Sequence, residues 1–185
     1  VSLFFAARNA GKRSVVLDLP GDEDRLHELL SYADVLVLSD LSPGGLDPNA
    51  LSERHPPLVV TAITPYGLTG PWKDRIATDG VLAATGSIAY KAGLPTKTPL
   101  FPPASFVDDC TAMPFAFGTL CALWQREETG YGQVLDCSSN EAIANQGDWT
   151  LHNLWSAREF GQPSPEVRNG AGPVWPSFKC ADGYV

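Results

Sequence analysis

The sequence has few of the residues that build metal centres or disulfide frameworks. Its 185 residues include four cysteines and three histidines, with no C-x-x-C pair and no H-E-x-x-H motif. We therefore predict that the protein binds no metal. Because the cysteines are widely spaced, we expect free, buried thiols in a reducing cytosol, so the predicted location is cytoplasmic.

Positive charge is scarce as well. Lysine and arginine number 13 against 21 aspartates and glutamates, which gives a formal net charge of −8. Without a cluster of lysines and arginines, such a chain is not expected to bind nucleic acid. We find neither an apolar run of membrane-spanning length nor a signal peptide, so a membrane partner is not expected either.

What the sequence does contain is the pattern of a globular α/β domain, with 44% hydrophobic and 18% charged residues. Apolar, β-branched runs predict strands over residues 14–19, 34–38, 58–63 and 133–137. Predicted helices opened by Gly21-Asp22 and by Asp47-Pro48 separate the first three strands. We therefore expect an open, mostly parallel, Rossmann-like sheet with helices on both faces. No G-x-G-x-x-G motif follows any of these strands, which argues against a dinucleotide cofactor.

The stretch from residue 104 to residue 136 organises the rest of the chain. Its apolar residues at helical spacing are Met113, Ala116, Phe117, Leu120, Leu123 and Trp124. They predict a helix that is buried on most sides and ends at a left-handed Gly130. Asp108 and Asp109 stand before this helix, where an aspartate is a favoured cap. The same surroundings suit a nucleophilic carboxylate, so the residues alone leave both roles open.

Four short motifs follow one another along the chain. They are Asn9–Leu19 (N-x-x-K-R-S-x-x-L-D-L), Tyr66–Pro71 (F/Y-G-x-T-G-P), the stretch around Asp108 and Gly118, and Thr129–Val134 (T-G-x-G-Q-x-V). In this order and spacing they resemble the family III CoA-transferases, also called the CaiB/BaiF family. The resemblance covers nearly the whole chain and implies the large domain of that family, here without its first strand.

This resemblance implies an acyl-CoA:carboxylate CoA-transferase, with coenzyme A or acyl-CoA as a substrate rather than a resident cofactor. In the family an aspartate attacks the acyl-CoA thioester, CoA returns to form an aspartyl-CoA thioester, and an acceptor acid then takes the CoA. That aspartate precedes the glycine of a G-x-L-x-A-L run by ten residues, so counting back from Gly118 selects Asp108 rather than Asp109. The full-length protein is expected to form an interlocked homodimer.

The resemblance also implies contacts to CoA. It places the loop 40–45 along the bound molecule and so selects Leu41, Ser42 and Gly45, whereas the residues alone indicate a simple tight turn. Lys12 and Arg13 are candidates to meet CoA phosphates because cations are scarce, with a solvated pair as the alternative. Arg75, which follows the Tyr66–Pro71 motif, is a further candidate.

We predict that residues 1–160 form the large domain and that residues 161–185 form a linker and the start of a second domain. An isolated large domain without its first strand should leave an apolar face or a bare sheet edge uncovered. We therefore expect the 185-residue chain to self-associate.

Two other functions stay open. Val107 and Ala112 replace family glycines on either side of Asp108, which favours a non-catalytic or truncated lobe that acts through a partner chain. The third possibility is an acyl-CoA racemase of the same fold, which by the resemblance would need a histidine at the position of Thr78.

We predict that the protein is not a racemase, because a threonine hydroxyl titrates far outside the range that a general base needs at neutral pH. When the full-length protein turns over a 2-methylacyl-CoA in deuterium oxide, no deuterium should enter the alpha carbon. Incorporation of deuterium at turnover rates would contradict this prediction.

Overall fold

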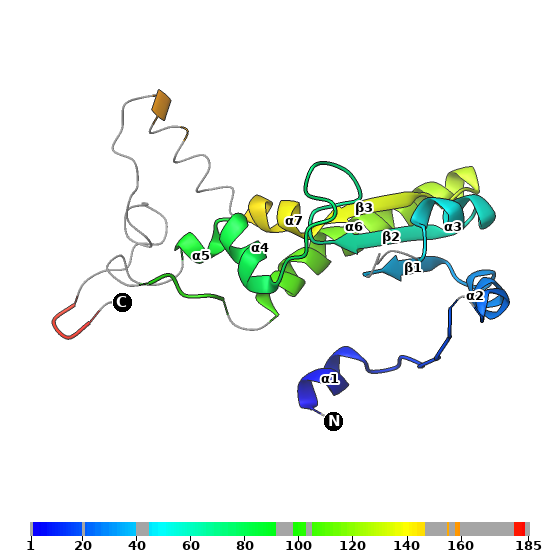
Figure 1. Ribbon diagram of the computed structural model, residues 1–185, viewed down its shortest axis with the longest axis horizontal. Helices are drawn as coiled ribbons and strands as arrows, with labels where there is room; N and C mark the ends of the chain where they lie inside the picture. The colour runs from blue at the N-terminus through cyan, green and yellow to red at the C-terminus, as the bar shows by residue number, and fades with distance from the viewer. Residues whose placement is uncertain are drawn as a thin grey trace. The chain divides into compact units, whose positions relative to one another are not determined.

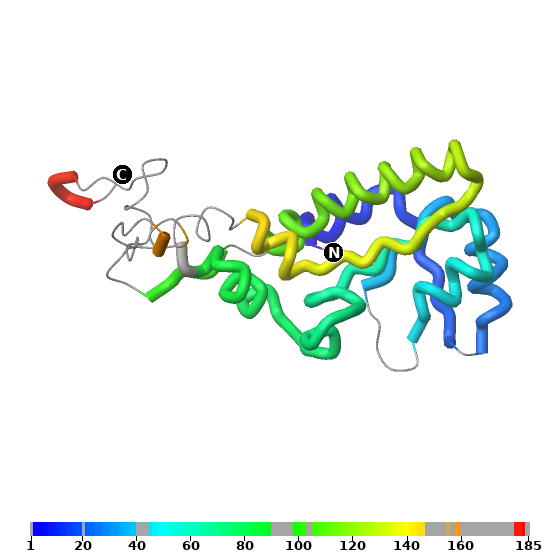
Figure 2. The backbone as a smooth tube through the Cα atoms, turned by 90° about the horizontal axis from the view of Figure 1, so that it is seen from above, coloured from blue at the N-terminus to red at the C-terminus, as the bar shows by residue number. Residues whose placement is uncertain are grey.

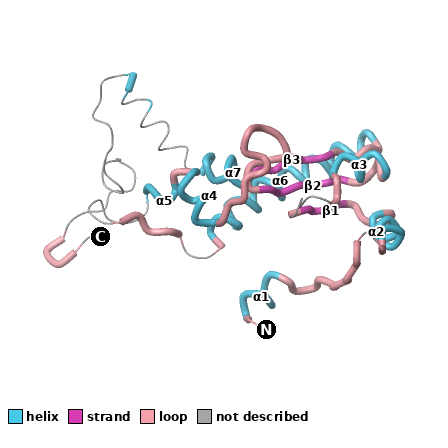
Figure 3. The backbone as a smooth tube through the Cα atoms, viewed as in Figure 1, coloured by secondary structure: helices cyan, strands magenta, loops and turns pink. Residues whose placement is uncertain are grey.

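The computed structural model describes residues 2–19, 21–39, 45–91, 98–102, 105–146, 155, 158–159 and 180–183. It divides the chain into two units, residues 1–33 and residues 34–185, and each is described by itself. Figure 1 labels the helices and strands, and Figure 3 separates helix, strand and loop by colour. The predicted domain boundary after residue 160 lies outside the described residues and stays a prediction.

The first unit contains two short helices, α1 (Leu3–Arg8) and α2 (Glu23–Leu30). Helix α1 begins after Ser2, whose hydroxyl accepts a hydrogen bond from the Phe5 backbone N–H at 3.1 Å. Helix α2 begins after Asp22, as the sequence predicts. The Asp22 carboxylate accepts the backbone N–H of Asp18 at 2.9 Å, so it closes the turn that leads into the helix.

The predicted strand over residues 14–19 is wrong. The segment forms neither helix nor strand, and its Val15 and Val16 side chains are 62% and 90% exposed. A β-branched run becomes a strand only when a neighbouring strand pairs with its backbone groups, and no described strand pairs with this one. Local composition could not reveal whether such a neighbour is present.

The second unit contains a three-stranded parallel sheet in the order β1-β2-β3, as the sequence predicts. The strands are β1 (Val35–Leu38), β2 (Val59–Thr64) and β3 (Val134–Ser138). In the central strand β2, residues 59, 60 and 62 are fully buried. Burial on both faces is the arrangement that a parallel sheet requires, because its connections return over those faces.

Helices cover the two faces of this sheet. Helix α3 (Pro48–Arg54) begins as predicted at Asp47, whose carboxylate accepts the Asn49 backbone N–H at 2.9 Å, with Pro48 in the first turn. The long helix α6 (Phe106–Thr129) lies on one face and α3 on the other (Figure 2). The fold is therefore an open α/β sheet with helices on both faces, as predicted.

A small core stands beyond the ends of the strands. It is built by α4 (Asp79–Thr85), α5 (Ile88–Lys91), α7 (Ser139–Gln146) and the start of α6. The buried members of this core are Leu82, Ala83, Ala89, Val107 and Ile143. At the start of α7 the Ser138 hydroxyl accepts the Glu141 backbone N–H at 3.3 Å, a cap favoured by a serine followed three residues later by a glutamate.

Small residues fit the inner face of α6 to the sheet. The hydroxyls of Thr119 and Thr61 are 2.8 Å apart and share a hydrogen bond between α6 and β2. A side chain at Gly118 would come within 3.2 Å of Leu135 on β3, so a glycine allows the helix to approach closely. The helix also contains Pro114, which has no backbone N–H for the helical ladder.

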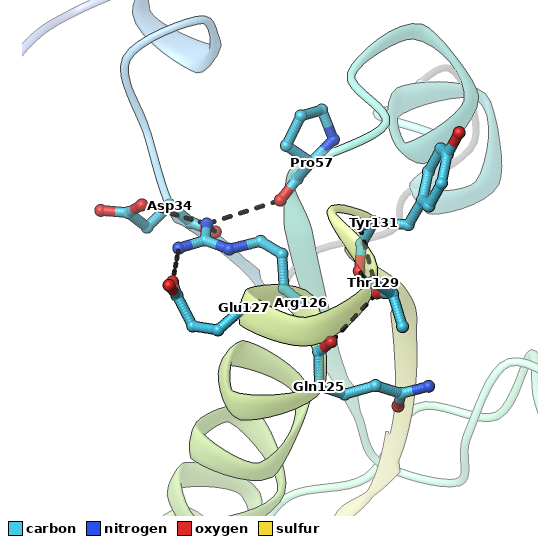
Figure 4. Close-up of polar contacts among 7 residues, drawn as sticks. All are labelled: Asp34, Pro57, Gln125, Arg126, Glu127, Thr129 and Tyr131. Atoms are coloured by element: carbon cyan, nitrogen blue, oxygen red, sulfur yellow. Dashed lines mark hydrogen bonds and ion pairs between the residues drawn. The ribbon is translucent and has the colours of Figure 1, made fainter.

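Polar contacts fix the C-terminal end of α6 (Figure 4). The Arg126 guanidinium pairs with the Asp34 carboxylate at 3.0 Å and donates to the Pro57 carbonyl at 3.5 Å. Asp34 precedes β1, and Pro57 precedes β2. Gly130 then ends the helix in the left-handed conformation, as predicted. Arg126 therefore ties this end of α6 to the amino ends of two strands.

The outer face of α6 contradicts the prediction that the helix is buried on most sides. Met113, Phe117, Leu120 and Trp124, here called the outer stripe, are between 64% and 75% exposed. Their spacing of four, three and four residues places all four on one side of the helix. The sequence showed that α6 is apolar on more than one side, but not which sides the fold covers.

By length and composition alone, α6 is apolar enough to cross a membrane, and it is the one such helix among the described residues. This differs from the expectation that the chain contains no apolar run of membrane-spanning length. The core helix of a soluble protein passes the same test, and the inner face of α6 lies on the sheet. The expectation of no membrane partner therefore stays a prediction.

We expect the 185-residue chain to self-associate through the outer stripe. Phe117→Ser combined with Leu120→Ser should weaken the association about tenfold or more, because each substitution removes an apolar side chain from the contact. Sedimentation velocity over a concentration series measures the change. Ile76→Ser, at an apolar side chain that is 94% exposed outside the stripe, is the matched control. Equal effects of the control and the double variant would contradict this assignment.

Candidate functional site

The direction of α6 decides which edge of the sheet holds Asp108. Arg126, in the last turn of the helix, contacts residues that precede β1 and β2, so the helix starts at the opposite edge, where the strands end. The loops after β2 and the start of α7 lie at the same edge, since both follow the ends of strands. Open α/β sheets bind their ligands at this carboxyl edge.

Asp108 lies in the first turn of α6 rather than at its cap. The cap residue is Ser105, which has a left-handed backbone with φ of 75°, and the helix begins at Phe106. Neither aspartate is therefore the N-cap residue, because the helix starts earlier than the sequence pattern indicated. In the first turn a carboxylate still benefits from the positive end of the helix dipole.

Asp109 has a local structural contact. Its carboxylate accepts a hydrogen bond from the Ser105 hydroxyl at 3.2 Å, and its backbone N–H donates to the Ser105 carbonyl at 2.8 Å. Both bonds join the fourth residue of the helix to its cap, where they stabilise a serine in a conformation that normally favours glycine. Asp109 therefore helps to shape the turn that carries Asp108.

The residues that flank the two aspartates attach this turn to the loop after β2. Val107 is buried in the small core beyond the strands, and Cys110 packs against that core. Tyr66 and Ala77, near the two ends of the loop, pack against the same core. The first turn of α6 and the loop 65–78 are thus parts of one packed structure.

Two strands hold the start of this loop. The Thr64 hydroxyl on β2 accepts the backbone N–H of Gly67 at 2.8 Å, and the Asp136 carboxylate on β3 accepts that of Leu68 at 2.8 Å. Gly67 has a φ of 86°, and a side chain there would come within 3.2 Å of the Asp136 carboxylate. Glycine is therefore needed both for the backbone conformation and for the close approach.

An aromatic pair and a cation follow in the same loop. The rings of Tyr66 and Trp72 meet edge to face, with centroids 5.3 Å apart. The Arg75 guanidinium carbon lies 4.8 Å from the centroid of the Trp72 ring. The structure thus brings the loop that contains Arg75 and the turn that contains Asp108 together at the carboxyl edge.

Comparison with known proteins shows the family of the chain. A family model described as CoA-transferase family III matches residues 1–185. The chain belongs to CoA-transferase family III. It is similar to the succinyl-CoA–L-malate CoA-transferase beta subunit of Chloroflexus aurantiacus, with 32% identity over 99% of this chain and 45% of the relative. It is also similar to the succinyl-CoA:(R)-benzylsuccinate CoA-transferase subunit BbsE of Thauera aromatica, with 32% identity over 100% of this chain and 45% of the relative.

Solved structures show the same fold. A crystal structure of a CaiB/BaiF family protein from Brucella suis matches with a TM-score of 0.75 and 26% identity, over 94% of this chain and 47% of that one. A structure of Rv3272 from Mycobacterium tuberculosis matches with a TM-score of 0.71 over 94% of this chain and 46% of that one. The chain thus spans about half the length of the relatives it matches.

The other predicted CoA-binding residues of this family III chain are distributed as follows. Gly45 is exposed in the second unit, after the end of β1. Leu41 and Ser42 lie outside the described residues. Lys12 and Arg13 belong to the first unit, where both are exposed and the Lys12 ammonium donates to the Asn9 side chain at 3.1 Å. Their contacts with CoA stay predictions.

Sequence reasoning missed three residues of this edge. It treated Tyr66 only as part of a motif and gave no role to Trp72 or Asp136. A signal was present for the aromatic pair. Both residues flank the Gly67–Pro71 turn, and both lie close in the sequence to Arg75, a candidate for binding CoA phosphate. Asp136 gave no such signal, because its partner Leu68 is distant in the sequence and only strand pairing brings them together.

Thiols near the site are poor nucleophiles. Burial raises the pKa of Cys110, and the negative charge of Asp109 raises it further. Burial and then the charge of Asp136 raise the pKa of Cys137 to about 11. A protonated Cys110 does not compete with a carboxylate for a thioester at neutral pH. No group of three or more potential ligands among the described residues could hold a metal, and the absence of a metal stays a prediction.

We predict that iodoacetamide at about pH 8 modifies the exposed Cys121 first, Cys110 more slowly and Cys137 slowest of these three, because a raised pKa lowers the thiolate fraction. Between about pH 8 and 10 the rate at Cys137 should rise roughly tenfold per pH unit. Peptide mass spectrometry measures the rates, and a urea-unfolded sample, in which the differences should vanish, is the control. Equal rates in the folded protein would show the prediction to be wrong.

Proposed function

We propose that the full-length protein is an acyl-CoA:carboxylate CoA-transferase and that Asp108 is its nucleophile. The observation that supports this most is the position of Asp108, in the first turn of α6 at the carboxyl edge of the sheet. Membership of CoA-transferase family III makes CoA thioesters the substrate class. The position count to Gly118 selects Asp108 over its neighbour.

The proposed reaction proceeds through covalent steps on Asp108. A carboxylate oxygen attacks the thioester carbonyl, the carbon–sulfur bond breaks, and CoA leaves as a thiolate, so that a mixed anhydride between Asp108 and the acyl group remains. The thiolate then attacks the aspartyl carbonyl, which releases the donor's acyl group as a carboxylate and leaves an aspartyl-CoA thioester. The acceptor carboxylate repeats the two steps in reverse, takes the CoA and restores Asp108. Dividing a difficult exchange in this way is what covalent catalysis offers.

The contacts of the neighbouring residues support this role. The Asp109 carboxylate is hydrogen-bonded to Ser105, and the Val107 side chain is buried in the core. We therefore assign both residues to the structure of the turn and not to the reaction. The raised pKa of Cys110 keeps the nearest thiol protonated. Reactive groups held on a rigid element lose less entropy in the reaction than groups on a free loop.

The names of two relatives suggest an acyl-CoA donor and a partner subunit to test. Both are named for succinyl-CoA as donor, so succinyl-CoA is the first donor to test, together with a panel of small carboxylic acids as acceptors. Both are also named as subunits of an enzyme. We propose an interlocked homodimer for the full-length protein, located in the cytoplasm, with a second type of subunit as the alternative outcome of a mass measurement.

A non-catalytic lobe that acts through a partner chain is the second candidate. It is favoured by Val107, which fills a core position where the resemblance implies a glycine and so removes the backbone freedom of a glycine beside the nucleophile. Formation of a covalent adduct by the full-length protein separates the two functions, since a non-catalytic lobe forms none.

We predict that Asp108→Asn abolishes both CoA transfer and the covalent adduct, because an amide is a far weaker nucleophile than a carboxylate. Asp109→Asn is the matched control: it should retain the adduct and lose about 1 kcal/mol of stability at most, through its bond to Ser105. The adduct is trapped with hydroxylamine after incubation with succinyl-CoA and located by peptide mass spectrometry. A label on Asp109, or an active Asp108→Asn variant, would disprove the assignment.

A further inference from the structure

Arg75 is stacked on an aromatic ring at the carboxyl edge. Its guanidinium lies over the Trp72 ring, and among the described residues it has no ion pair or side-chain hydrogen bond. Arg126, by contrast, uses its guanidinium on Asp34, Pro57 and Glu127. An arginine stacked through its flat face keeps its N–H donors, which lie in the plane, available for another group.

The tryptophan beneath Arg75 is itself held in place. The Tyr66 ring meets Trp72 edge to face, and Tyr66 packs on the core that contains Val107 and against which Cys110 also packs. The backbone N–H of Arg75 also donates to the Trp72 carbonyl at 2.9 Å, so the turn between the two residues is closed. A continuous series of contacts therefore runs from the Asp108 turn to the guanidinium.

We propose that Trp72 is a positioning residue that presents Arg75 to a phosphate group of the CoA thioester. This inference rests on the proposed function, because it assumes that a CoA thioester binds at this edge. Stacking restricts a long side chain before the ligand arrives, so less conformational entropy is lost when the phosphate binds. The planar donor fork of an arginine also matches two phosphate oxygens at once.

The arrangement explains why an arginine is needed at this position. A lysine carries the same charge but presents it as a point on a flexible stem, without a planar face to stack on the ring or a fork to bind two oxygens. The neighbouring Lys73 is exposed in the same loop, where the cation stacked on Trp72 is Arg75. It provides a matched cation outside the stack.

The test measures CoA binding by isothermal titration calorimetry and KM and kcat with succinyl-CoA, on the full-length protein. Arg75→Met should weaken CoA binding and raise KM about tenfold or more, with kcat unchanged at saturation. Trp72→Ala should weaken CoA binding and raise KM by roughly two- to fivefold. Trp72→Phe should keep most of the affinity, because an aromatic ring remains beneath the guanidinium. Arg75→Lys should not restore it, and Lys73→Met should have little effect.

The decisive comparison is the double variant. If Trp72 acts through Arg75, Trp72→Ala combined with Arg75→Met should bind CoA no more weakly than Arg75→Met alone, because the effects of coupled residues do not add. The loss in Arg75→Met should shrink for a CoA fragment that lacks phosphate. Additive losses, or an unchanged affinity in Trp72→Ala, would overturn the proposal.

Two controls keep these outcomes interpretable. Thermal melting of each variant identifies loss of fold. If Trp72→Ala does not fold, the CoA affinity of Trp72→Phe is measured in its place. Equilibrium binding of CoA requires no catalysis, so it separates the two proposals. If CoA binds and responds to the Arg75 variants while no aspartyl adduct forms, the proposed function fails and the role of Trp72 stands.

Discussion

The seating of α6 on the sheet is the constraint on which the rest of the second unit depends. The shared hydrogen bond between Thr61 and Thr119 fixes the middle of the helix, and Arg126 fixes its end at Asp34 and Pro57. Once these contacts are made, the direction of the helix is set, and its first turn must lie where the strands end. The location of Asp108 thus follows from contacts that lie several turns away from it.

The two sides of α6 carry residues of very different size. Small side chains on the inner side let the helix approach the strands, whereas the outer stripe consists of large side chains that no described residue buries. A helix with this distribution is suited to lie between two layers rather than at a surface. Among the described residues the sheet supplies one of these layers, and the outer stripe is left exposed.

Much of the fold could be predicted because its signals are local. Asp47 and Pro48 start α3, Gly130 ends α6, and the apolar runs of β1, β2 and β3 lie within a residue or two of their predicted places. The strand over residues 14–19 failed because a strand depends on its neighbour, which composition does not reveal. In the site, the resemblance to the family selects Asp108 by its distance from Gly118, and this choice stays a prediction. Asp136 and the stack of Trp72 and Arg75 depend on tertiary contacts that spacing along the chain does not encode.

Pro114 divides α6 into two parts with different attachments. Since a proline has no N–H, the carbonyl of Cys110 lacks its usual partner in the helical ladder, and cooperativity is interrupted at this turn. The part after Pro114 is anchored to the sheet through Thr119 and Arg126, whereas the part before it packs on the small core through Val107. The position of the turn that carries Asp108 therefore depends on the packing of the small core, whereas the position of the later turns depends on the sheet.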